Sequence, residues 1–399
     1  MNQKNIEIQF LRVIAIVMVL IMHAPVGMLH QYAEKFSTIM AFIHPAVGVD
    51  IFFVISGYLM GITFLHRTEL NRTNFDNTSN LNSTDGNLNS ADSNFNSADL
   101  NKNVLSEKIS LTARFYLRRF WRLFPASFFW ITVTLIVGVI SGDHEIWLTN
   151  DWLYKAWIAS VLCFRNFQES IHPTHLGYYW SLSVENQFYL LLPLAWFFVP
   201  KKWFWKGVIL ICIICIFWRP GGNEWWLFRF DGLLMGLLIY KLTRIDAFKD
   251  AVRFMSPETR TGRLIMTAFL CLAIPSVPNS IGVYPPLTWS IVALLSSILV
   301  SQAVLNEGYI YIPEFLKQPI YWLGEFSYSV YLCHLPVWLI FKDAVKRNPD
   351  WIDKPSIVLT IGVVSTISIF ICAALTYFFI EQPCQKIGYR KLNQNVKNR

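Results

Sequence analysis

Ten apolar runs, each close to the length of a membrane-crossing helix, divide almost the whole 399-residue chain. A helix needs about 20 mostly apolar residues to cross the hydrocarbon core of a bilayer, and it satisfies its backbone hydrogen bonds internally, as lipid requires. Hydrophobic residues make up 54% of the chain and charged residues only 15%, which excludes an ordinary soluble domain. The sequence therefore predicts an all-α integral membrane protein, with about ten transmembrane helices in one bundle, at residues 6–24, 46–65, 120–140, 178–199, 203–218, 225–241, 264–280, 285–304, 320–341 and 356–380.

Basic residues predict how the bundle is inserted in the membrane. Lys and Arg favour the cytoplasmic side of short loops, and most of the 34 Lys and Arg residues fall on that side when the N-terminus is placed inside. We therefore expect a multi-pass protein with both termini in the cytoplasm. This topology also explains the formal net charge of +8, so nucleic acid is not an expected partner.

One segment has a different composition from the rest. Residues 68–108 contain an imperfect Asn- and Ser-rich repeat, which reads NRTNFDNTSNLNSTDGNLNSADSNFNSADLNKN at 71–103. Such a segment has too few apolar side chains to form a core. We expect a disordered cytoplasmic loop, inserted between the second and third spans.

The first span contains the stretch LRVIAIVMVLIMHA, which carries a cation and an imidazole on one helix face. Arg12 and His23 are eleven residues apart, which at roughly 100° per residue is within ~20° of three whole turns. At ~1.5 Å per residue the two positions are ~16 Å apart along the helix axis. Polar residues inside a span are costly and indicate a functional site. This face therefore places a cation near one membrane surface and an imidazole deep toward the other.

Further polar residues fall in the outer half of the predicted bundle. Asp50, in HPAVGVDIFFVISGYLM, lies at about the depth of His23, and a hydrogen bond between the two would fix the imidazole tautomer. The alternative is that Asp50 caps its own helix. Glu185, in YYWSLSVENQFYLLLPL, either lines a cavity or forms a structural ion pair with an arginine. Arg229 and His334 lie in two other spans, and His334 has the alternative of being a satisfied core histidine.

The inner edge of the bundle is basic. RFYLRRFWRLFPA leads into the third span with Arg119 and Arg122 three residues apart, at the level of Arg12. Guanidinium groups bind phosphate oxygens through two parallel hydrogen bonds, so this face is a candidate phosphate clamp. Positive-inside anchoring is the alternative reading of the same residues.

Together these motifs resemble the acyltransferase-3 family of bacterial membrane O-acyltransferases. The resemblance covers nearly the whole chain and rests on Arg-x10-His in the first span, followed in order by GVDIFFVISGYLM, RRFWR, WSLSVENQFYLLLPL, RFDGLLMG, SYSVYLCHLPV and the closing IEQP. Three positions depart from the family pattern: Asn186 stands where a second Glu is common, Cys333 where Trp is common, and Gln382 where Arg is common. Many relatives carry an additional periplasmic esterase-like domain, and this chain is expected to be a stand-alone member.

The resemblance implies one acyltransferase domain over residues 1–399, in the inner membrane of a bacterium. It implies transfer of an acyl group, most often acetyl, from cytoplasmic acyl-CoA to a hydroxyl of an extracytoplasmic glycan or glycolipid, without a metal or a tightly bound cofactor. His23 would act as general base on the acceptor hydroxyl or would first take the acyl group itself. The implied roles are catalysis by His23, Asp50 and Glu185, binding of acyl-CoA by Arg12, Arg119 and Arg122, and binding of the acceptor by Trp180, Ser183, Arg229 and His334.

Two other classes of membrane protein also place polar residues in their spans. A secondary transporter or lipid-linked-sugar flippase would use them to line a pathway, but the sequence shows no internal repeat and no paired Gly- or Pro-broken spans of the kind found at transporter sites. A lipid-sugar glycosyltransferase would hold a metal-bound nucleotide sugar with a D-x-D pair, and the sequence contains no such pair.

Overall fold

The computed structural model describes residues 5–24, 38, 40–70, 97–217, 229–281, 285–351 and 354–397. Within these ranges every regular element is a helix and no strand occurs, so the predicted all-α class is confirmed. The elements up to residue 217 are α1 (Ile6–His23), η2 (Pro45–Val47), α3 (Gly48–Met60), η3 (Gly61–His66), α5 (Ser97–Ser141), α6 (His144–Trp147), α7 (Asn150–Val161), α8 (Arg165–Ile171), η4 (Gly177–Tyr179), α9 (Trp180–Phe198) and α10 (Lys201–Phe217). The later elements are α11 (Asp231–Leu242), α12 (Asp246–Met255), α13 (Arg260–Ile281), α14 (Pro285–Leu305), α15 (Glu314–Lys346), η6 (Pro349–Trp351), α16 (Pro355–Thr376), η7 (Tyr377–Glu381) and α17 (Gln382–Lys397).

Six helices in the described ranges are long and apolar enough to cross a membrane, whereas the sequence predicted ten. The other four predicted spans are helical as α9, α10, α11 and α15, but α10 and α11 have only 17 and 12 residues, fewer than the ~20 that a bilayer core requires. Polar residues such as Glu185 lower the hydropathy of α9 and α15. The count of ten and the cytoplasmic termini therefore stay predictions. The six are Ile6–His23, Pro45–Leu70, Ser106–Ser141, Arg260–Ser280, Leu287–Leu305 and Pro355–Lys391.

The predicted Asn-rich insert lies mostly outside the described residues, which omit 71–96. Its two flanks are helical, since residues 68–70 continue the helix that follows η3 and residues 97–108 form the beginning of α5. α5 is 45 residues long, so it extends far beyond the span predicted at 120–140. The added N-terminal turns are rich in Leu, Lys, Arg and Glu, which are strong helix formers, and this explains the extension.

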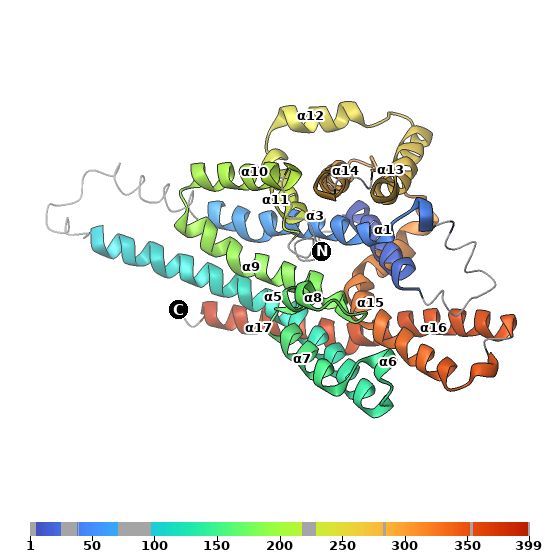
Figure 1. The fold of residues 1–399 in the computed structure, drawn as a ribbon. Coiled ribbons are helices and arrows are strands. Elements are labelled where there is room, and N and C mark those ends of the chain that lie inside the picture. Colours follow the sequence, from blue (N-terminus) through green and yellow to red (C-terminus); the bar gives the residue numbers. More distant parts are fainter. Residues whose placement is uncertain are drawn as a thin grey trace, which may run out of the picture.

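Five helices, α1, α3, α5, α9 and α15, pack around the centre of the described structure. α5 and α9 lie side by side and run in opposite directions, because Tyr116 donates a 2.8 Å hydrogen bond to the carbonyl of Leu190 while Tyr179 donates one of 3.1 Å to Ser127. α17 packs along α5 and α16 along α15 (Figure 1). The polar residues singled out in the sequence are carried mainly by these central helices.

Glycines allow the closest helix crossings. Where α3 crosses α11, a Cβ atom at Gly57 would overlap the carbonyl oxygen of Leu233, and one at Gly236 would overlap that of Val54. In membrane proteins small residues let helix backbones approach in this way, and dispersion and polar contacts replace the hydrophobic effect. The α3–α11 contact is therefore fixed by backbone shape rather than by side-chain choice.

We expect Gly57→Ala to reduce the free energy of unfolding by about 1 to 3 kcal/mol, the usual cost of overpacking. Gly207→Ala is the matched control, because a Cβ atom at Gly207, on α10, meets no atom within 4 Å. Intrinsic tryptophan fluorescence during heating in detergent measures both variants. Equal melting temperatures for Gly57→Ala and wild type would contradict the crossing described above.

Candidate active site

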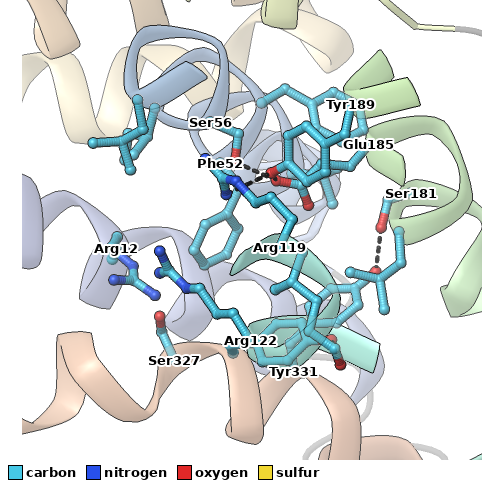
Figure 2. A pocket seen from close by; sticks show the side chains of 17 residues that line it. Arg12, Phe52, Ser56, Arg119, Arg122, Ser181, Glu185, Tyr189, Ser327 and Tyr331 are labelled. Atoms are coloured by element: carbon cyan, nitrogen blue, oxygen red, sulfur yellow. Dashed lines mark hydrogen bonds between the residues drawn. The ribbon is translucent and has the colours of Figure 1, made fainter. Parts of the chain in front are cut away.

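A pocket with about 710 Å³ of empty space, open mouth included, lies among α1, α3, α5, α9 and α15. Figure 2 shows the side chains around it, which include three arginines, a glutamate and several serine and tyrosine hydroxyls. We call it the central pocket. Four of the residues selected from the sequence line it together, namely Arg12, Arg119, Arg122 and Glu185.

A second opening, which we call the arginine mouth, adjoins the central pocket. Its empty space is about 900 Å³, and it shares Arg12, Arg119 and Arg122 with the central pocket. Arg67 and Arg118 add two further guanidinium groups to its lining. The predicted cationic cluster therefore exists as a three-dimensional arrangement that joins residues from α1, α5 and the helix that follows α3.

The three shared arginines differ in how firmly the protein holds them. Arg119 lies over the ring of Tyr189, 4.6 Å from its centroid, and donates long hydrogen bonds of 3.4 Å to the Tyr189 hydroxyl and to Thr63. Arg12 donates one of 3.5 Å to Gln9. Arg122 forms no hydrogen bond or ion pair with other residues in the described ranges. Guanidinium groups with weak internal partners retain donors for an anionic ligand.

Two buried carboxylates face the arginine mouth. Glu325 accepts a hydrogen bond of 3.0 Å from Gln9, and Glu381 accepts one of 2.9 Å from Ser329. Sequence reasoning did not select either of them, although Glu381 belongs to the closing IEQP motif. Buried like charges are costly unless opposite charges lie nearby. These two residues therefore offset part of the positive charge that the arginines bring into the bundle.

Glu185 connects the arginines to a set of hydroxyl groups. Its Oε1 accepts a 2.5 Å hydrogen bond from Ser56 and a second one from the hydroxyl of Tyr189, the ring on which Arg119 lies. Glu185 thus lines the cavity, as one of its two predicted roles required, but its partners in the described contacts are hydroxyls. Its hydrogen bonds place Glu185 beside the arginines, and its catalytic role with His23 stays a prediction.

Arginines line one part of the central pocket, and Tyr331 and Ser181 line the part nearest to the histidines. The Tyr331 hydroxyl donates to the carbonyl of Tyr178 at 2.6 Å and is therefore left to accept from Ser181, also at 2.6 Å. His334 follows Tyr331 by one turn of α15, and the ring centroids of His334 and His23 are 5.0 Å apart. A histidine pair therefore lies one helical turn beyond the pocket.

α1 carries the predicted face without a break. It runs as one helix over 18 residues, with Arg12 in the central pocket and His23 in its last turn against α15. The helical rise then gives the ~16 Å separation expected from the sequence. Nδ1 of His23 lies 2.9 Å from the carbonyl oxygen of Val19. The carbonyl can only accept, so Nδ1 carries the proton and Nε2 is left as the basic atom.

Asp50 has a different partner from the one predicted. It forms an ion pair with Arg229 of the segment before α11, and both side chains are almost fully buried. The guanidinium also lies 4.0 Å from the centroid of the Trp289 ring. The predicted hydrogen bond to His23 is therefore replaced by an ion pair with a guanidinium group. The capping alternative is also wrong, since Asp50 sits inside the first turn and Val47 occupies the N-cap.

The predicted acceptor-binding residues do not gather around the central pocket. The Ser183 hydroxyl accepts a 3.2 Å hydrogen bond from the backbone N–H of Arg165 and faces α8. Trp180 packs edge-on against Phe53, at 6.0 Å between ring centroids. Arg229 belongs to the ion pair with Asp50, and only His334 contacts His23.

The described residues offer donors for an anionic ligand rather than ligands for a metal. In the described ranges no three His, Cys, Asp or Glu side chains gather in a way that could hold a metal ion. The arginine mouth suits phosphate groups, the central pocket suits a neutral linker, and the histidine pair supplies a base. This arrangement can bind a phosphate-bearing molecule and transfer a group ~16 Å from its anionic end.

Comparisons with known proteins identify a family and several relatives. The chain matches the Acyltransferase domain family, acyltransferase 3, over residues 5–377. It is 27% identical over 387 residues to the putative peptidoglycan O-acetyltransferase YrhL of Bacillus subtilis, a match that covers 88% of this chain and 52% of the relative. It is 26% identical over 390 residues to the peptidoglycan O-acetyltransferase OatA of Listeria monocytogenes, covering 88% and 53%, and 26% identical over 377 residues to the O-acetyltransferase OatA of Staphylococcus aureus, covering 86% and 53%.

The same comparisons give the extent of the match. The chain spans about half the length of these curated relatives, and it matches no solved structure. The family match nevertheless covers far more than half of the chain. The protein belongs to the acyltransferase-3 family of membrane acyltransferases.

Proposed function

We propose that this protein moves an acetyl group from cytoplasmic acetyl-CoA to a hydroxyl of a cell-envelope glycan on the other side of the membrane. The observation that carries this proposal is that the arginine mouth and the central pocket share three arginines, and that the central pocket reaches Tyr331, one turn of α15 from the histidine pair. The names of the relatives, which are peptidoglycan O-acetyltransferases, support acetyl as the group and a glycan hydroxyl as the acceptor.

The donor is proposed to bind with its phosphates at Arg12, Arg119 and Arg122. The weak internal hydrogen bonds of these side chains support this role, because charged donors without strong partners gain most from a phosphate. The pantetheine arm then extends through the central pocket toward His23. Substrate binding at a distance from the reacting carbonyl is what orients the thioester for attack.

His23 is proposed to act on the acceptor hydroxyl. Its Nε2 takes the hydroxyl proton while the oxygen forms a bond to the thioester carbonyl carbon, and the carbon–sulfur bond breaks. The proton then passes to the departing CoA thiolate, so CoA leaves as the free thiol. In the second route Nε2 first attacks the carbonyl itself, and the acceptor oxygen then takes the acetyl group from the imidazole. Both routes use the same residue and release the same products.

Release of free CoA is the test of enzyme function. Purified full-length protein in detergent, supplied with acetyl-CoA and chitopentaose, is expected to release CoA thiol and to form an acetylated glycan in equal amounts. The thiol is measured with a chromogenic disulfide and the acetyl product by mass spectrometry. A transporter or flippase would leave the thioester intact, and an intact thioester at high protein concentration would contradict the proposal.

A further inference from the structure

His334 is fully buried, and its Nε2 atom has no hydrogen-bond partner in the described part of the chain. Its Nδ1 lies 2.6 Å from the carbonyl oxygen of Tyr331. Because the carbonyl can only accept, Nδ1 carries the proton and Nε2 is a bare lone pair. Such an unpaired buried acceptor is rare in native proteins, and a functional role is one of the accepted explanations.

His23 is placed to supply the missing donor. The two ring centroids are 5.0 Å apart and the ring planes are inclined by 61°, without a hydrogen bond between the rings in the described structure. Rings at this separation bring two nitrogens to about 3 Å, a hydrogen-bond distance, when these nitrogens turn toward each other. Neutral His23 donates through Nδ1 to Val19 and has no second proton to give. Protonated His23 has one. The lone pair of His334 therefore gains a donor only after His23 has taken a proton.

The surroundings of His334 disfavour a second positive charge on the pair. Its ring is enclosed by those of Tyr178, Tyr331 and Trp338, at centroid distances of 5.4, 5.6 and 5.7 Å. Aromatic rings attract a cation, whereas two like charges at this distance in a medium of low dielectric repel each other strongly. The two neutral rings are thus suited to take up one additional proton between them, but not two.

We propose that His334 is a positioning residue, which accepts a hydrogen bond from His23 in the state in which His23 is protonated. This inference rests on the proposed function, since it needs His23 as the base. The proton leaves the acceptor hydroxyl for Nε2 of His23, and once the acceptor oxygen has bonded to the acyl carbon, the new N–H of His23 donates a hydrogen bond to Nε2 of His334. The proton then moves to the sulfur of the departing CoA. Because the hydrogen bond exists only in the charged state, it accelerates the reaction without strengthening substrate binding.

Two substitutions of His334 separate this role from packing. His334→Gln retains an acceptor, the amide oxygen, whereas His334→Phe retains an aromatic ring among Tyr178, Tyr331 and Trp338 but offers no acceptor. We expect His334→Phe to lower kcat about tenfold to 100-fold, as for loss of one hydrogen bond to a charged group. We expect His334→Gln to stay within about threefold of wild type, and KM for acetyl-CoA to be unchanged in both. The readout is CoA thiol release by the purified full chain, with water or chitopentaose as acceptor.

A packing role predicts the reverse order, with His334→Phe the more active variant, and that order or equal activity of the two variants would overturn the inference. His44→Phe is the matched control, because His44 also has a ring nitrogen without a partner in the described residues but packs against Trp289. It should keep wild-type kcat. An inactive His23→Ala with a fully active His334→Phe rejects only this inference, whereas an active His23→Ala rejects the proposed catalytic base itself.

Discussion

Replacing His23 by alanine is expected to lower acetyl transfer by about 10²- to 10⁴-fold, the contribution of a positioned general base. The imidazole is held by the carbonyl of Val19 so that Nε2 is the basic atom, and it lies against His334, one turn of α15 beyond the central pocket. The loss should appear in kcat, measured as CoA thiol release. The amount of folded protein and the Kd for acetyl-CoA should remain those of the wild type.

Replacing an arginine of the mouth is expected to change Kd rather than kcat, the opposite of the result expected for His23→Ala. Arg122→Ala should weaken acetyl-CoA binding by the ~1.5 to 3 kcal/mol typical of hydrogen bonds to charged groups, while kcat at saturation is largely kept. Arg114→Ala is its control, since Arg114 lies on the same helix but lines neither the central pocket nor the arginine mouth. His23→Ala with activity within a few-fold of wild type would remove His23 from the reaction. An unchanged Kd for Arg122→Ala would leave the arginine cluster as a topology signal only.

Features that depend on one helix were predictable from the sequence. The spacing of Arg12 and His23 needs only the helical period and rise, and α1 is one unbroken helix, so the residues lie where the spacing places them. Arg119 and Arg122 share a face of α5 for the same reason, and both line the central pocket. In each case a polar residue in an apolar run indicated a cavity, because a polar side chain is costly where it faces lipid.

Features that depend on pairs of distant residues were not predictable. Asp50 and Arg229 are 179 positions apart, and their pairing follows from the close crossing of α3 and α11 at Gly57 and Gly236. Asp50 and His23 have similar predicted depths in the membrane, and this made His23 the expected partner of Asp50. Depth alone does not say which neighbouring helix a side chain faces. The guanidinium of Arg229, in the segment before α11, therefore pairs with the carboxylate.

Depth itself is known from sequence only to about a turn or two. Glu185 was expected to act in catalysis together with His23, but its hydrogen bonds to Ser56 and Tyr189 place it with the arginines. Ser183 faces α8. This helix has seven residues and no apolar run from which it could be predicted. Glu325 is buried opposite the arginines, and its position inside the span predicted at 320–341 was a signal that the sequence analysis did not use.

Donor and acceptor should reach the site from opposite faces of the membrane. The arginine mouth and the histidine pair lie at different levels of the bundle, with Arg12 and His23 separated by three turns of α1. A phosphate-bearing donor of high charge cannot cross the hydrocarbon core, so it has to enter from the side on which the arginines open. The acceptor hydroxyl has to meet the acyl group at the histidine pair.

The direct measurement uses sealed vesicles in which the protein has one known orientation. Acetyl-CoA carrying a radiolabelled acetyl group is supplied only on the cytoplasmic side, and chitopentaose is confined either to the opposite side or to the same side. We predict label on the glycan when it is on the opposite side, none when both are cytoplasmic, and none for His23→Ala in either arrangement. Labelling only when donor and acceptor share the cytoplasmic side would contradict transfer across the membrane.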